Sequence, residues 1–64
     1  MFDYNALKNY LVENGLKQKI VAAKAHIDEV AFSDILNGKR KCPLENYVNI
    51  CRVLGLPFDT FIVI

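Results

Sequence analysis

Apolar residues of this chain recur at helical spacing, in segments bounded by residues that start or end helices. In the first segment Leu7, Tyr10 and Leu11 fall on one face. Asp3 before it is a suitable N-cap, and Asn14-Gly15 after it can take the left-handed conformation that closes a helix. The pattern therefore predicts a first helix between these two boundaries.

Two short helices joined by a tight turn are predicted next. The first extends from about Gln18 to Ala25, and His26-Ile27 forms the turn. Asp28 is a suitable N-cap for the next helix, which ends at Asn37-Gly38 because both residues accept positive φ. The residues expected to face inward are apolar, and the alanines among them allow another helix to approach closely: Val21, Ala22, Ala25, Phe32, Ile35 and Leu36.

A basic loop over residues 39–42 is expected to precede a fourth helix. Pro43 suits the first turn of this helix, which runs from roughly Leu44 to Leu54 and is closed by Gly55. Its buried stripe is expected to consist of Leu44, Tyr47, Cys51 and Leu54.

The end of the chain admits two interpretations. Pro57 can open a fifth, short helix as far as Phe61. Residues 61–64 are aromatic or β-branched, so they can instead extend as a strand.

The chain has 64 residues, which predicts one small domain over residues 1–64. A domain of this size buries only about 60% of the surface that its unfolded chain exposes. Because 53% of the residues are hydrophobic and the chain ends in an apolar run, we expect some apolar surface to serve self-association. The candidates for a dimer contact are Phe58, Phe61, Ile62, Val63 and Ile64.

Charge is distributed unevenly although its sum is only +1. Residues 17–41 hold six basic and three acidic residues, whereas the remainder holds two basic and four acidic residues. This distribution favours an anionic ligand at the middle of the chain.

The same segment carries a series of residues whose order and spacing resemble the Xre-like family, the helix-turn-helix of the Cro and phage-repressor type. The resemblance covers roughly Leu7 to Phe61. In the second helix it rests on a glutamine near the start and on an aliphatic-alanine pair. After that helix come an aliphatic residue in the turn, two apolar residues in the third helix, and a closing Asn-Gly, basic run and proline. These are Gln18, Val21-Ala22, Ile27, Phe32, Ile35 and residues 37–43, followed by Leu54-Gly55.

The resemblance implies an all-α, compact five-helix domain of the lambda-repressor-like type, with its helix-turn-helix unit at about residues 17–37. Such a protein is a sequence-specific regulator of transcription that places the helix over residues 28–37 in the major groove of double-stranded DNA. The implied partners are a pseudo-palindromic operator and a second copy of the chain. The implied base-reading residues are Glu29, Val30, Ser33 and Asp34, and the implied phosphate contacts are Lys17, Gln18, Lys19, Asn37, Lys39, Arg40 and Lys41.

The acids of the third helix set this chain apart from the usual family pattern, in which glutamine, arginine, serine or threonine read the bases. The carboxylates of Glu29 and Asp34 can accept a hydrogen bond from cytosine N4, and Val30 can contact a thymine methyl group. Alternatively, Glu29 complements the positive end of the helix dipole and Asp34 is solvated. A third interpretation is that both acids suppress nonspecific DNA binding.

A second function also fits these acids. The chain could be a protein-interaction module, antirepressor-like or antitoxin-like, that keeps the fold without specific DNA binding. The acidic reading positions and the apolar end of the chain suit that role.

Other chemistries find little support. With a single histidine, His26, and no nucleophile-base set or phosphate-binding glycine loop, the sequence predicts no catalytic residue, metal site or cofactor. No apolar run reaches the roughly 18 residues that cross a bilayer, and two cysteines make no disulfide framework, so a cytoplasmic, nucleoid-associated protein is expected. Three cations precede Cys42 and could lower its pKa, so oxidation sensing is a minor alternative for this thiol.

Overall fold

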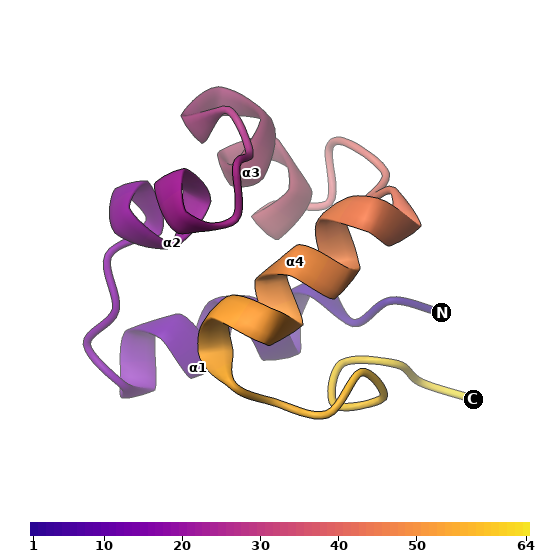
Figure 1. Ribbon diagram of the computed structural model, residues 1–64. Coiled ribbons are helices and arrows are strands. Elements are labelled where there is room, and N and C mark those ends of the chain that lie inside the picture. Colours follow the sequence, from indigo (N-terminus) through magenta and orange to yellow (C-terminus); the bar gives the residue numbers. More distant parts are fainter.

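Four α-helices make up the computed structural model, which describes residues 1–64 (Figure 1). They are α1 (Tyr4–Glu13), α2 (Gln18–Lys24), α3 (Glu29–Leu36) and α4 (Leu44–Leu54). These bounds agree with the first four predicted helices to within a residue or two. None of the helices is long and apolar enough to span a membrane.

Side-chain caps fix the starts of two helices. Asp3 accepts a hydrogen bond from the backbone N–H of Ala6 at 3.0 Å, at the start of α1. One carboxylate oxygen of Asp28 accepts from the N–H groups of Val30 and Ala31 at 3.1 and 3.2 Å, at the start of α3. Both predicted N-caps are confirmed, whereas Lys17, the residue before α2, provides no side-chain cap.

The helices enclose one core, to which α2 contributes through contacts with α3 and α4, and α1 through contacts with α3. Every residue of the second and third helices that was predicted to face inward is buried. The core cluster consists of Leu7, Leu11, Val21, Ala22, Ala25, Ile27, Phe32, Leu36, Tyr47, Ile50, Cys51 and Phe61.

The buried stripe of α4 differs from the predicted one at its first turn. Leu44 is 77% exposed, and its neighbours Pro43 and Glu45 are exposed too, so this turn lies outside the core. The buried residues of α4 are Tyr47, Ile50 and Cys51, and the predicted stripe residue Leu54 is half-buried.

The predicted fifth helix is absent, and residues 57–61 form turns instead. The hydroxyl of Tyr47 donates to the carbonyl of Phe58 and accepts from the N–H of Phe61 at 3.3 Å. A helix would need both of these backbone groups for its own i to i+4 hydrogen bonds. Because a buried side chain of α4 occupies them, the segment closes only shorter bonds, such as Thr60 N–H to the Pro57 carbonyl at 3.2 Å.

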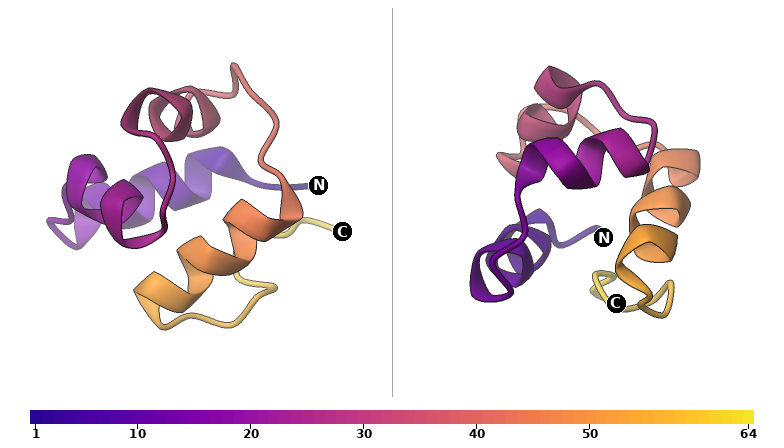
Figure 2. Two further views of the ribbon diagram at one scale, coloured as in Figure 1. Left: turned by 45° about the horizontal axis from the view of Figure 1, so that its top comes forward. Right: turned by 60° about the vertical axis from the view of Figure 1, so that its left-hand side comes forward.

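The two ends of the chain pair with each other. Phe2 and Ile62 form an isolated antiparallel bridge, and hydrogen bonds of 2.7 Å join Asp3 N–H to the Phe61 carbonyl and Val63 N–H to the Met1 carbonyl. The ends lie close together in all views (Figures 1 and 2). Residues 61–64 therefore form neither a helix nor a strand, and their strand-like pairing is limited to the single bridge at Ile62.

Gly38 closes α3 and also admits the ring of Tyr4. Its φ is +72°, in the left-handed region that favours glycine. A Cβ atom at this position would lie 2.5 Å from Cζ of Tyr4, so the aromatic ring of α1 packs directly on the Gly38 backbone. Gly15, with φ +63°, has no atom within 4 Å of such a Cβ.

We therefore expect Gly38→Ala to destabilise the protein more than Gly15→Ala. Left-handed strain alone should lower the free energy of unfolding by about 1 kcal/mol at Gly15. At Gly38 the loss should be at least about 2 kcal/mol, because the Tyr4 ring must also move. Urea unfolding of both variants measures the difference, and equal losses would show that the Tyr4 contact contributes nothing.

Cys42 is a protonated thiol rather than an activated one. Burial, followed by the nearby Cys51, raises its pKa from 9.0 to about 11, so the preceding cations do not activate this thiol. Lys39, Arg40 and Lys41 are all exposed to water, where their charges are screened. The partly buried sulfur lies among apolar residues packed on the core.

This raised pKa predicts slow alkylation of Cys42 at neutral pH. Only the thiolate reacts, so its rate with iodoacetamide at pH 8 should be about a hundredfold lower in the native protein than in the urea-unfolded chain. The native rate should rise about tenfold per pH unit up to about pH 11. Peptide mass spectrometry assigns the rate to Cys42, and a plateau near pH 9 would contradict the raised pKa. The stabilisation that the buried thiol provides is present below pH 9 and is lost between pH 9 and 11.

Candidate nucleic-acid interface

A left-handed residue in the turn sets the direction of α3 relative to α2. His26 has φ +59° and an exposed side chain, while the next residue, Ile27, is buried. The Ile27 N–H donates to the Ala22 carbonyl at 2.9 Å and so closes the end of α2. The turn at His26-Ile27 that the sequence predicted is confirmed.

The inner face of α3 is buried, which leaves a defined outer face. Phe32, Ile35 and Leu36 are each no more than 1% exposed. On the outer face Glu29 is exposed and Val30 is 66% exposed, and Ser33 and Asp34 are half-buried. The four predicted base-reading residues thus lie on the same helix but differ in their access to solvent.

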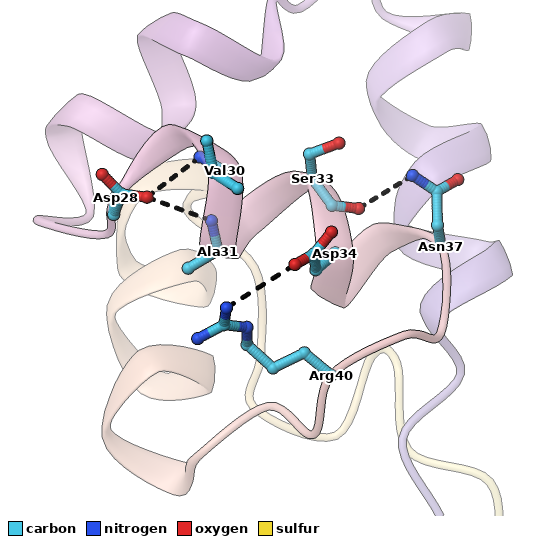
Figure 3. A network of polar contacts seen from close by, with 7 residues as sticks. All are labelled: Asp28, Val30, Ala31, Ser33, Asp34, Asn37 and Arg40. Atoms are coloured by element: carbon cyan, nitrogen blue, oxygen red, sulfur yellow. Dashed lines mark hydrogen bonds and ion pairs between the residues drawn. The ribbon is translucent and has the colours of Figure 1, made fainter.

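Polar contacts join the last turns of α3 to the loop that follows it (Figure 3). The amide nitrogen of Asn37 donates to the Ser33 carbonyl at 2.9 Å. The Lys39 N–H donates to the Asp34 carbonyl at 2.9 Å, and the Gly38 N–H to the Ile35 carbonyl at 3.2 Å. These bonds hold the start of the basic loop against the last turn of α3.

Arg40 reaches back from the loop to α3. Its guanidinium Nη2 lies 3.6 Å from Oδ2 of Asp34, with both side chains partly exposed (Figure 3). This is the only ion pair of the protein, so Lys39 and Lys41 carry charges that no carboxylate neutralises. The loop projects from the body of the molecule (Figure 2), where these cations can meet an anion.

Lys8 is a further cation of this surface that sequence reasoning missed. Its Nζ donates to Oδ1 of Asn37 at 2.9 Å, which brings α1 to the end of α3. The two residues are 29 positions apart, and no local pattern in the sequence relates them. The amide of Asn37 therefore has a partner on both sides, and the basic surface consists of Lys8, Lys39, Arg40 and Lys41.

A second group of predicted phosphate contacts lies at the start of α2. Lys17 and Lys19 are exposed and Gln18 is half-buried. Because no side chain caps α2, N–H groups in its first turn lack a side-chain acceptor. An anion at this position would meet N–H groups and two lysines.

The predicted dimer contacts divide into exposed and buried residues. Phe58, Ile62 and Val63 are 52%, 40% and 47% exposed, and Ile64 is fully exposed. Phe61 is only 3% exposed and stacks edge-on against Tyr10, with ring centroids 6.0 Å apart. Its side chain belongs to the core of the chain itself, so the expectation that it offers surface to a partner is corrected.

Comparison with known proteins identifies the arrangement. A family model described as helix-turn-helix matches residues 7–61, which include all four helices except the first residues of α1. No curated protein and no solved structure gave a significant match. The matched range coincides with the range over which the sequence resembles the Xre-like pattern. The chain therefore belongs to the helix-turn-helix family of the Cro and phage-repressor type, a family of DNA-binding regulatory domains.

Proposed function

We propose that the protein is a sequence-specific transcriptional regulator, a repressor of the phage or mobile-element type, that binds a pseudo-palindromic operator as a homodimer. The observation that carries this proposal is the outer face of α3, where Glu29 and Val30 are exposed, Ser33 and Asp34 are half-buried, and a basic loop flanks the end of the helix. In a helix-turn-helix protein that face enters the major groove.

The first turns of α3 supply the base contacts. Val30, 66% exposed, can meet the methyl group of a thymine. The exposed carboxylate of Glu29 and the half-exposed carboxylate of Asp34 can accept from N4 of cytosine, and Ser33 can contact either donors or acceptors. An operator rich in cytosine at these positions would satisfy both acids.

Phosphate contacts come from the two sides of α3. On one side lie the cations of the loop, Lys39, Arg40 and Lys41, with Asn37 and Lys8 next to them. On the other side lie Lys17, Gln18 and Lys19 at the start of α2. Such contacts fix the position of the helix on the duplex but carry no sequence information.

Dimerisation is proposed through the apolar surface near the chain ends. Phe58, Ile62, Val63 and Ile64 expose apolar side chains next to the terminal bridge. Such a contact adds to the stability of a small domain, and it lets the dimer bind two half-sites of an operator.

An alternative is a protein-interaction module of the antirepressor or antitoxin type. The acids on the outer face of α3 favour it, because a carboxylate near a polyanion opposes binding unless a base donor meets it. Complete absence of salt-dependent DNA affinity, together with capture of a protein through α3, would support this alternative.

The loop cations are expected to contribute to DNA affinity whatever the base sequence. Replacing Lys39, Arg40 and Lys41 with alanine should weaken binding to every duplex, and the slope of log K against log salt should fall by about 0.9 per lost contact. Fluorescence anisotropy at several salt concentrations measures the slope. Arg52→Ala, which removes an exposed cation from α4, is the matched control and should leave the slope unchanged.

The proposed base contacts and the proposed dimer should also give the protein a preferred DNA sequence. Selection of bound duplexes from a random pool should return inverted repeats whose half-sites lie about one helical turn apart, as a dimer requires. Glu29→Gln should change the preferred base at one position in each half-site, because an amide pairs with adenine rather than with cytosine. Single, unpaired sites would argue against a dimer, and an unchanged preference would show that Glu29 does not read a base.

A further inference from the structure

We propose that Asp34 and Arg40 act as an exchange pair that makes tight DNA binding conditional on the base that Asp34 meets. In the free protein each side chain neutralises the other. On DNA, Arg40 turns to a phosphate and Asp34 must find a donor in the groove. This inference rests on the proposed function. It adds that the phosphate contact of Arg40 and the base contact of Asp34 are energetically coupled.

The pair is built by the backbone around it. Hydrogen bonds from the N–H groups of Asn37 and Lys39 to the carbonyl of Asp34, at 3.3 and 2.9 Å, fold the loop back on α3. This fold directs the Arg40 side chain along the outer face of the helix to the Asp34 carboxylate, 3.6 Å away (Figure 3). Gly38 lies in the middle of the same turn, in a left-handed conformation that only glycine adopts without strain.

The pair is weak enough to exchange. Both side chains are partly exposed, 55% for Arg40 and 34% for Asp34, and water competes for an ion pair of this kind. A phosphate offers the guanidinium two acceptor oxygens in a geometry that it matches well. The approach of a duplex can therefore draw Arg40 away from the helix.

Release of Arg40 leaves Asp34 without a cation. The carboxylate is then on the face that enters the groove, where most base edges present acceptors that repel it. Cytosine N4 is a donor and can replace the guanidinium. A cognate site thus supplies partners to both residues, whereas a sequence without a donor at that position supplies a partner only to Arg40.

Glu29 provides a matched comparison. It is an acid on the same helix and is exposed, yet no cation lies within ion-pair distance of it. Its charge can oppose DNA directly, but it cannot hold Arg40. Any coupling to Arg40 should therefore be confined to Asp34.

The test is a double-mutant cycle with Asp34→Asn, Arg40→Gln and the combined variant, measured on the selected operator and on a random duplex of equal length. On random DNA, Asp34→Asn should strengthen binding, and by about two- to fivefold more with Arg40 present than in the Arg40→Gln background. On the operator, Asp34→Asn should weaken binding, so the ratio of the two affinities falls. Glu29→Gln should have the same effect in both backgrounds.

Additive effects of Asp34→Asn and Arg40→Gln on random DNA would overturn the exchange, and so would equal coupling of Glu29 to Arg40. Failure of the proposed function is distinguishable, because the unaltered protein would then bind neither duplex with a salt-dependent affinity. Thermal unfolding of each variant verifies that these exposed substitutions leave the fold intact.

Discussion

Burial of one side of α3 is the constraint on which the rest of the structure depends. Phe32, Ile35 and Leu36 are almost fully buried, and α2, whose Val21 and Ala22 are buried too, packs against this helix. A rotation of α3 about its axis would bring apolar side chains into water, a loss on the order of 1.5–3 kcal/mol for each residue exposed. The orientation of the outer face is therefore fixed by what the inner face must bury.

The end of α3 converts this fixed orientation into a fixed loop. Gly38 leaves the helix in a left-handed conformation beneath the Tyr4 ring, and the backbone of residues 37–39 bonds back to the last turn. Helix and loop consequently form one surface on which acids and cations are neighbours. The net charge of such a surface says less about it than which of its charges are paired, as Asp34 and Arg40 are, and which are not.

The sequence was most informative where structure is set locally. Caps such as Asp28, and helix ends such as Asn37-Gly38, depend on a few adjacent backbone groups, so their residue types are sufficient to locate them. Contacts between distant segments were missed for the opposite reason. The bond between Lys8 and Asn37 and the capture of two backbone groups by Tyr47 exist only after the helices have packed. The second of these contacts replaced the expected fifth helix by turns.

The terminal bridge between Phe2 and Ile62 has a practical consequence for anyone who handles this protein. Any segment fused to either end emerges at the same corner of the molecule, beside Phe58 and Val63. A purification tag or a fluorescent label at that corner would crowd the apolar patch, whichever end carries it. Labels for solution work are better attached to a side chain on the far part of α1, such as Glu13 after exchange for cysteine, where the chain is exposed and no predicted contact lies.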